Sequence, residues 1–233
     1  MNRRLVTAMA DLHFAPTQRA LDALLAEAVP ARRIMLTGNT VVDALQEILQ
    51  RPASFADARL KALTGRIILL TALRRENFGE RLEQICLAAS DLLRRFPDVS
   101  LVFPVHPNPH VTATAQKLLG NQPRAVLTSP LPYPDFVHLM KSASLILSDS
   151  GGVQEEAPSV GTPVLVLRDV TERPEGVESG WAEVVGTKRT KILEHATAWL
   201  EGAGQRPPVS RGNPFGDGKA GARIVSALQQ FRE

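Results

Sequence analysis

Continuous apolar runs alternate with helix-like apolar stripes along most of the chain. Residues 66–72, RIILLTA, are almost entirely apolar, and from Phe78 to Leu93 apolar side chains recur every three or four positions. A strand buried on both faces gives the first pattern, and an amphipathic helix gives the second. The pair repeats, with strands predicted at 99–106, 125–129, 144–149, 163–167 and 182–186, and helices at 110–119, 134–143, 151–157, 190–202 and 218–231. This alternation predicts an α/β fold, a doubly wound parallel Rossmann-like sheet with helices on both faces.

The two ends of the chain depart from this regular alternation. Residues 16–30 carry a helical apolar stripe with Thr17 as the expected N-cap, and residues 33–40 are β-prone and end in a glycine turn. A Gly- and Pro-rich stretch, 202–218, precedes the last helix. We therefore expect a connecting helix and first strand at 1–40, a Rossmann-like domain at 41–210, and a C-terminal turn and helix at 211–233.

Composition narrows the class of protein. Hydrophobic residues make up 44% and charged residues 22% of the 233 positions, which excludes disordered and fibrous chains. The net charge is only +3 and the basic residues are scattered, so we expect no nucleic-acid partner. A single cysteine, Cys86, excludes a disulfide framework and a cysteine-rich metal site and favours a cytoplasmic protein. No apolar run approaches the ~20 residues that span a bilayer, so we expect no membrane partner.

A glycine pair follows the predicted strand at 144–149. The segment SDSGGVQEEAP, residues 148–158, places Gly151 and Gly152 where a strand ends and a helix begins. Glycines let a ligand approach the backbone closely, and the first amides of a helix have no intrahelical acceptor. The hydroxyls of Ser148 and Ser150 add donors, so the segment predicts a site for an anion such as a diphosphate, without a metal or other cofactor. It matches neither the P-loop nor the G-x-G-x-x-G pattern.

Two adjacent glutamates follow the glycines. On a helix Glu155 and Glu156 point about 100° apart, so at most one of them faces the loop. We favour Glu156, four residues after Gly152, as a carboxylate that accepts hydrogen bonds from a ribose diol. The alternative is a capped helix whose acidic residues only stabilise its positive end. The loop by itself leaves both interpretations open.

Several longer motifs occur together and in a fixed order. They are DLHFAPT, TGNTVVDAL, RREN, FPVHPNP, PLPYPDFVHLM, SDSGGVQEEAP, GTPVLVLRDVTERPEG and NPFGDGKA. In this combination the chain resembles the non-hydrolysing UDP-N-acetylglucosamine 2-epimerase family from about residue 10 to its C-terminus. The resemblance implies the C-terminal lobe of a GT-B-type architecture, with an active site between two Rossmann-like halves.

The resemblance also implies a reaction. Family members interconvert UDP-GlcNAc and UDP-ManNAc by removing the C2 proton and eliminating UDP; UDP then returns to C1, and a proton is added to C2 from the opposite face. Stabilising the departing UDP is electrostatic work for fixed backbone donors and cations. By motif, Ser150, Gly151 and Gly152 would hold the diphosphate and Glu156 the ribose.

Three further residues are assigned by the same resemblance. His106 in FPVHPNP and Phe136 in PYPDF would contact the base and adjoining groups, and Arg173 in TERPEG would pair with a phosphate. Each has a plain structural alternative. His106 would be a satisfied histidine beside prolines, Phe136 a core aromatic, and Arg173 one half of a loop ion pair. Residues 213–218 are expected to form a structural turn.

Two departures from the family pattern matter. The family motif T-x-H-R-R-E-N reads TALRREN here, so Leu73 replaces an active-site histidine, with Arg74 and Glu76 beside it. Leucine neither donates nor accepts a hydrogen bond, and loss of a general acid or base costs roughly 10²- to 10⁴-fold. The family's N-terminal half, which carries the acidic residues that handle the C2 proton, has no counterpart here. We expect UDP binding, little or no epimerisation by this chain alone, and no assignable catalytic residue.

Three interpretations of function follow. In the first, the chain is the UDP-binding half of an epimerase and needs a separate N-terminal half. In the second, it is a non-catalytic UDP-sugar-binding module or a remnant, which Leu73 favours. In the third, it is a lobe of a GT-B glycosyltransferase, which RREN and TERPEG disfavour. The expected partners are UDP or a UDP-N-acetylhexosamine, with a separate N-terminal half or a homodimer as the protein partner.

Overall fold

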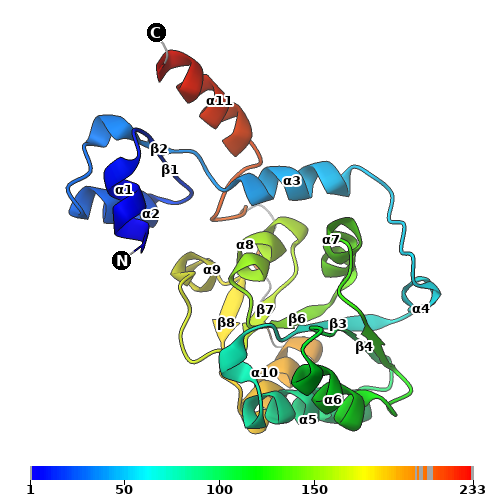
Figure 1. The fold of residues 1–233 in the computed structure, drawn as a ribbon. Helices are drawn as coiled ribbons and strands as arrows, with labels where there is room; N and C mark the ends of the chain where they lie inside the picture. The colour runs from blue at the N-terminus through cyan, green and yellow to red at the C-terminus, as the bar shows by residue number, and fades with distance from the viewer. Residues whose placement is uncertain (1, 203, 205–206, 209–211, 232–233) are drawn as a thin grey trace. The chain divides into compact units, whose positions relative to one another are not determined.

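The computed structural model describes residues 2–202, 204, 207–208 and 212–231, and the chain divides into two compact units (Figure 1). The larger unit spans residues 51–211, and the smaller one combines residues 1–50 with residues 212–233. Residues 41–50 therefore group with the smaller unit, whereas the sequence-based division assigns them to the Rossmann-like domain. That three-part division stays a prediction.

A parallel sheet of six strands forms the centre of the larger unit, in the order β5-β4-β3-β6-β7-β8. Its strands are β3 (Arg66–Thr71), β4 (Val99–Pro104), β5 (Ala125–Thr128), β6 (Leu145–Ser148), β7 (Val164–Val166) and β8 (Ala182–Val184). The chain builds outward from β3 to β5, then returns to the other side of β3 and builds outward again to β8. This order confirms the doubly wound Rossmann-like sheet, and it puts the topological switch point between β3 and β6.

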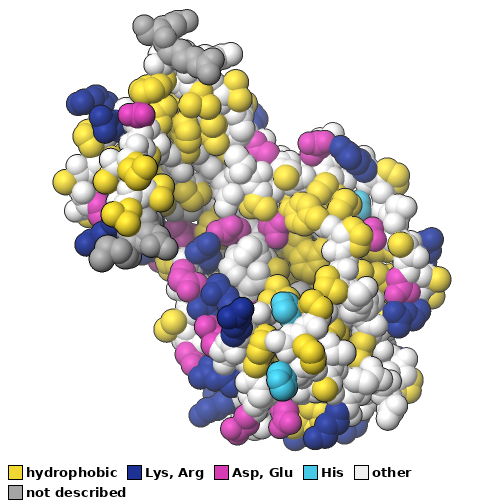
Figure 2. Space-filling model, viewed as in Figure 1, with side chains coloured by type: hydrophobic (Ala, Val, Ile, Leu, Met, Phe, Trp, Pro, Cys, Tyr) yellow, Lys and Arg dark blue, Asp and Glu magenta, His cyan; other side chains and the backbone are white. Residues whose placement is uncertain are grey.

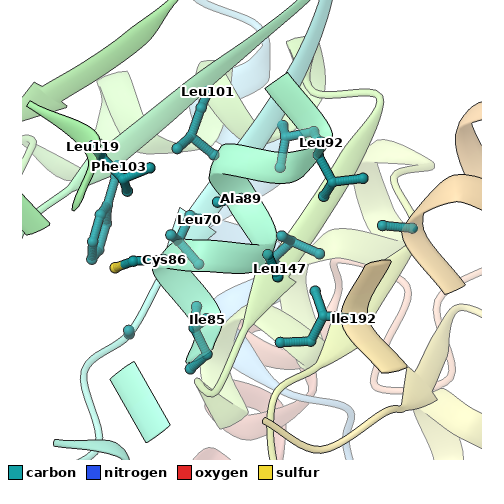
Figure 3. Close-up of a cluster of buried hydrophobic side chains, with 14 of the residues drawn as sticks. Leu70, Ile85, Cys86, Ala89, Leu92, Leu101, Phe103, Leu119, Leu147 and Ile192 are labelled. Carbon is teal, nitrogen blue, oxygen red and sulfur yellow. The ribbon is translucent and has the colours of Figure 1, made fainter. Parts of the chain in front are cut away.

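One face of the sheet carries the main hydrophobic core. Helices α5 (Glu80–Arg95), α6 (Pro109–Leu119) and α10 (Arg189–Leu200) cover this face (Figure 1). Alternate strand residues, Leu70 on β3 and Leu101 on β4 among them, point toward α5, as the two-residue period of a strand requires (Figure 3). The buried Cys86 lies in this core, where burial raises its thiol pKa to about 12, so the cysteine acts as a small apolar side chain.

The opposite face of the sheet carries the helices that flank the candidate site. These are α7 (Tyr133–Ser142) and α8 (Gly151–Val160), with the short α9 (Pro174–Glu178) after β7 (Figure 1). Helix α8 ends at Gly161, whose φ of 72° is left-handed and therefore suits a glycine C-cap. The remaining short elements of this unit are α4 (Ala58–Lys61) and the 3-10 turn η2 (Arg75–Asn77).

The smaller unit holds two parallel three-residue strands, β1 (His13–Ala15) and β2 (Ile34–Leu36). Its other elements are α1 (Asn2–Met9), α2 (Gln18–Ala26), η1 (Ala31–Arg33), α3 (Thr40–Leu49) and α11 (Ala220–Phe231). Thr17 caps α2 as predicted, since its hydroxyl accepts a hydrogen bond from the Ala20 amide at 3.2 Å. Helix α1 and strand β1 were not predicted, because eight residues with an isolated stripe and a three-residue strand carry too little periodicity.

The turn before α11 forms as predicted. Asn213 accepts a hydrogen bond from the Phe215 amide at 2.8 Å, and Gly218 has a φ of 80°. Asp43 of α3 then accepts hydrogen bonds from the Ala220 and Gly221 amides at the start of α11. Every helix in the described part of the chain is too short or too polar to cross a bilayer.

Candidate nucleotide-binding site

The candidate site begins where β3 and β6 end side by side. Thr71 and Ser148 are register partners at the carboxyl ends of these strands, and their buried hydroxyl oxygens lie 2.7 Å apart in a hydrogen bond. Ser148 also accepts a hydrogen bond from the Ser150 amide at 3.0 Å. The segments TALRREN and SDSGG, which are 76 residues apart in sequence, therefore meet at the switch point, where α/β sheets bind ligands.

A fully buried carboxylate joins the two segments. Asp149 accepts hydrogen bonds from the Leu73 amide at 2.9 Å, the Arg74 amide at 3.0 Å and the Asn77 side-chain amide at 2.8 Å. A buried charge is costly unless hydrogen bonds compensate it, and these three donors do so. Asp149 was not predicted from the sequence, because its donors come from a distant segment. The only local signal was a carboxylate directly after an apolar strand.

The start of helix α8 is capped at only one of its first three amides within the described residues. Ser150 is the N-cap, and its hydroxyl lies 3.5 Å from the Val153 amide. Within the described residues, the Gly151 and Gly152 amides have no hydrogen-bond acceptor. Unpaired amides at the positive end of a helix bind anions, and glycines leave room for a ligand to approach them. The segment is therefore a capped helix, and its role in binding a diphosphate stays a prediction.

Two arginine side chains lie beside these amides. A Cβ atom added to Gly151 would lie 3.7 Å from Nη2 of Arg173 and 3.9 Å from Nη2 of Arg74. The structure therefore brings Arg173 close to Gly151, and its pairing with a phosphate stays a prediction. It also adds Arg74, which the sequence indicated only as a neighbour of the altered motif position. Guanidinium groups suit phosphate oxygens because of their charge and their planar fork of donors.

Carboxylates already contact both arginines. Arg173 donates a hydrogen bond from Nε to Glu155, so the loop ion pair that was left open as an alternative is present. Arg74 lies 4.0 Å from Glu172. The arginine charges are therefore balanced by carboxylates of the surrounding loops and helix.

A buried arginine ties the surrounding loops together. Arg168, 7% exposed, donates a hydrogen bond to Glu76 at 3.1 Å and pairs with Glu172 through two donors. The Arg168 guanidinium lowers the pKa of Glu172 to about 2. Glu76 of the RREN motif thus acts as a loop anchor in this structure.

Glu156, the predicted ribose ligand, lies on α8 behind the glycines. It is buried, and it accepts a hydrogen bond from the hydroxyl of Tyr133, the first residue of α7. Burial raises the pKa of Glu156, and the Tyr133 hydrogen bond opposes that rise only in part. Burial also raises the pKa of the Tyr133 hydroxyl. This tyrosine partner was not predicted from the sequence, and the ribose role stays a prediction.

The two residues predicted to contact the base lie on the loop after β4 and on α7. His106 Nδ1 accepts a hydrogen bond from the Asn108 amide at 3.2 Å, and its ring centroid lies 6.3 Å from that of Phe78. This satisfies one ring nitrogen, as the structural alternative expected. Phe136 is only partly buried on α7. Their role in base binding stays a prediction.

The altered motif position faces solvent. The Leu73 side chain is 44% exposed, although its amide is fixed by Asp149. On the view in Figure 2, basic and acidic side chains are interspersed over the larger unit instead of forming a single-sign patch. Within the described residues, no group of three or more His, Cys, Asp or Glu side chains is arranged to hold a metal ion.

A Rossmann-like sheet with unpaired helix amides and two arginines at its switch point is typical of nucleotide-binding α/β lobes. A sequence model of the UDP-N-acetylglucosamine 2-epimerase family matches residues 1–229. The chain therefore belongs to the UDP-N-acetylglucosamine 2-epimerase family, as the motifs predicted.

Individual relatives agree with this assignment. A probable UDP-N-acetylglucosamine 2-epimerase from Ralstonia nicotianae is 46% identical over 99% of this chain and 64% of the relative. A solved structure of a putative UDP-N-acetylglucosamine 2-epimerase from Listeria monocytogenes covers all of this chain at 41% identity with a TM-score of 0.91. The chain covers 63% of that structure, so it spans about two thirds or less of each relative's length.

Two further structures concern the ligand and the fold. The UDP-GlcNAc 2-epimerase of Neisseria meningitidis, solved bound to UDP-GlcNAc, is 40% identical over 98% of this chain and 64% of its own, with a TM-score of 0.87. A wall teichoic acid polymerase at 15% identity has a TM-score of 0.58, a likeness of fold alone that fits the predicted GT-B-type lobe.

Proposed function

We propose that this chain binds UDP and UDP-N-acetylhexosamines as the UDP-binding half of a UDP-N-acetylglucosamine 2-epimerase. One observation carries the proposal: the Gly151 and Gly152 amides lack acceptors within the described residues, and the Arg74 and Arg173 side chains lie beside them. Four donors of this kind suit the two phosphates of UDP. The complex of the Neisseria meningitidis relative with UDP-GlcNAc supports the choice of ligand.

The other predicted contacts complete the proposed binding mode. Ser150 adds its hydroxyl to the diphosphate site, Glu156 accepts the ribose hydroxyls, and His106 and Phe136 contact the base. For the ribose to reach Glu156, the Tyr133 hydroxyl must share or give up the carboxylate oxygen that it now contacts. The proposed ligand therefore exchanges one hydrogen bond of Glu156 for another, which keeps the buried carboxylate satisfied.

We further propose that the chain epimerises little or not at all alone. Leu73 places an aliphatic side chain at the position of the motif histidine, so no proton can be exchanged there. A complementary N-terminal half is the proposed protein partner, with a homodimer as the other arrangement.

A non-catalytic UDP-sugar-binding module is the second candidate function, and Leu73 is the observation that favours it. Binding of UDP would be the same in both cases. The two candidates differ in whether histidine at position 73 and an N-terminal half together give turnover. An epimerase half gains activity from that combination, whereas a module that has lost other catalytic contacts does not.

Titration calorimetry with UDP tests the binding proposal. Arg74→Ala and Arg173→Ala should each weaken UDP binding about tenfold, because each removes a charge-assisted contact to phosphate. Arg95→Ala is the matched control, since Arg95 is also an ion-paired surface arginine but lies at the far end of α5. The proposal fails if wild-type chain binds no UDP, or if all three variants bind UDP equally well.

A further inference from the structure

Asp149 connects the two halves of the proposed phosphate site through one side chain. It directly precedes Ser150 and the Gly151 amide on one loop, and it holds the Leu73 and Arg74 amides of the other loop. Strand β3 ends at Thr71, so these amides lie beyond the sheet's hydrogen-bond ladder. The carboxylate supplies the acceptors that the ladder no longer provides.

The hydrogen bonds from the Leu73 and Arg74 amides to Asp149 fix the position of the Arg74 backbone. Two consecutive amides bound to one rigid carboxylate fix the backbone at position 74, and the Asn77 amide fixes the turn that follows. Arg74 then has only its side-chain torsions left with which to reach Gly151, and Nη2 does lie beside that glycine. Asp149 itself is completely buried and pairs with no arginine or lysine within the described chain. Its charge is balanced by N–H groups, so it does not compete for the guanidinium.

We propose that Asp149 is a positioning residue, which holds the Arg74 guanidinium beside the Gly151 amide and so sets the affinity for the pyrophosphate group of UDP. This inference rests on the proposed function. In Asp149→Asn, an NH2 group replaces one of the two carboxylate oxygens. Its N–H donors would then face the backbone and Asn77 N–H groups that now donate to that oxygen. The loop would then lose its fixed position, and UDP binding should weaken about tenfold, as in Arg74→Ala.

A double-mutant cycle separates positioning from a general loss of structure. UDP binding is measured by calorimetry for Asp149→Asn alone and combined with Arg74→Ala or with Arg173→Ala. In the Arg74→Ala background, Asp149→Asn should lower UDP affinity less than about twofold. In the Arg173→Ala background, it should lower UDP affinity as much as it does in the wild type. An equal loss of affinity in both backgrounds would overturn the inference, because a merely structural role does not depend on Arg74.

Amide hydrogen exchange gives a second readout that needs no ligand. Leu73 and Arg74 should be protected in the wild type and lose protection in Asp149→Asn. Thr71→Val is the matched control, since it removes the adjacent buried hydroxyl contact and leaves the carboxylate clamp in place. Its Leu73 and Arg74 amides should stay protected.

Two outcomes keep this inference separate from the proposed function. If the wild-type chain binds no UDP, the proposed function fails. If the amide hydrogens of Leu73 and Arg74 exchange at the same rate in Asp149→Asn as in the wild type, the positioning role of Asp149 is overturned, whatever the result for UDP. If Asp149→Asn does not fold, Asn77→Ala replaces it in the cycle, because it removes one of the three donors and keeps the carboxylate. The Asn77→Ala effect on UDP affinity should likewise vanish in the Arg74→Ala background.

Discussion

Neighbouring residues on one helix have opposite surroundings, and Glu155 and Glu156 illustrate this at the residue scale. In the structure Glu155 accepts a hydrogen bond from Arg173, whereas the buried Glu156 accepts one from Tyr133. The sequence predicted that at most one of them would face the loop. It could not predict the tyrosine partner, because that contact joins helices 23 residues apart.

Burial of Glu156 predicts a measurable pH dependence. Its pKa is raised in the folded chain above the ordinary 4.5, so the unfolded chain releases this proton first as pH rises. The free energy of unfolding should therefore fall as the pH rises from about 4.5 until it passes the folded-state pKa of Glu156. Each tenfold difference in proton affinity between the folded and unfolded chains corresponds to about 1.4 kcal/mol. Glu156→Gln should lack this loss. Urea unfolding at pH 4.5 and pH 7.5 measures both proteins.

Comparison of the wild type with Glu156→Gln isolates the titration of Glu156, because all other carboxylates titrate in both proteins. Glu80→Gln, at an exposed position on α5, is the matched control and should follow the wild type. A stability difference between wild type and Glu156→Gln that does not grow from pH 4.5 to pH 7.5 would contradict the assignment of a raised pKa.

At the scale of elements, apolar periodicity predicted each strand of the larger sheet and the helices α5, α6, α7, α8 and α10, but not the five-residue α9 between β7 and β8. Most of these strands lie in continuous apolar runs of the sequence, as Ile67 to Leu70 of β3 do. Loop contacts were beyond the sequence, because they depend on which strands become neighbours. Asp149 meets Leu73 only because β6 lies beside β3, and Arg168 meets Glu76 only because β7 follows in the same sheet.

The loop after β7 carries the element-scale prediction. Arg173 must leave or share Glu155 to contact a phosphate, so that ion pair opposes the proposed ligand. Glu155→Gln should bind UDP a few-fold more tightly, because a neutral amide competes less for the guanidinium. Calorimetry with UDP measures the change. The control is Glu183→Gln, which should leave UDP affinity unchanged. The Glu183 carboxylate, on β8, pairs with His195 of α10.

A double variant decides whether the gain arises at Arg173. The benefit of Glu155→Gln should disappear in an Arg173→Ala background, where no guanidinium remains to be released. If Glu155→Gln binds UDP more weakly than the wild type, Glu155 supports the site and does not compete with the ligand.

At the scale of the whole molecule, the fold and family could be predicted from the sequence, whereas the need for a second half that supplies acid and base groups stays a proposal. The family's matched motifs run through both compact units, and the family model covers residues 1–229. The groups proposed to bind the phosphates lie on the loops after β3, β6 and β7 of the larger unit. The one motif position that departs from the pattern, Leu73, lies at the same switch point and is exposed there.

That exposed leucine leads to the last prediction, a complementation assay with four combinations. Wild-type chain and Leu73→His are each assayed for conversion of UDP-GlcNAc, alone and with an added N-terminal half from the Ralstonia nicotianae relative. Neither should turn over alone, because the proposed acid and base groups belong to the other half. With the partner, Leu73→His should exceed the wild type by roughly 10²- to 10⁴-fold, the usual contribution of a general acid or base.

Leu73→Gln is the matched control, since it adds a polar side chain that cannot exchange a proton and should stay near the wild-type rate. Turnover by the wild-type chain alone at ordinary enzyme rates, about 1 to 10³ per second, would contradict the proposal that a second half is required. Inactivity of Leu73→His with its partner, while UDP still binds, would instead favour the non-catalytic module. The exposed position of Leu73 means that the histidine can be introduced without disturbing the core, so a failure of this variant would reflect chemistry and not folding.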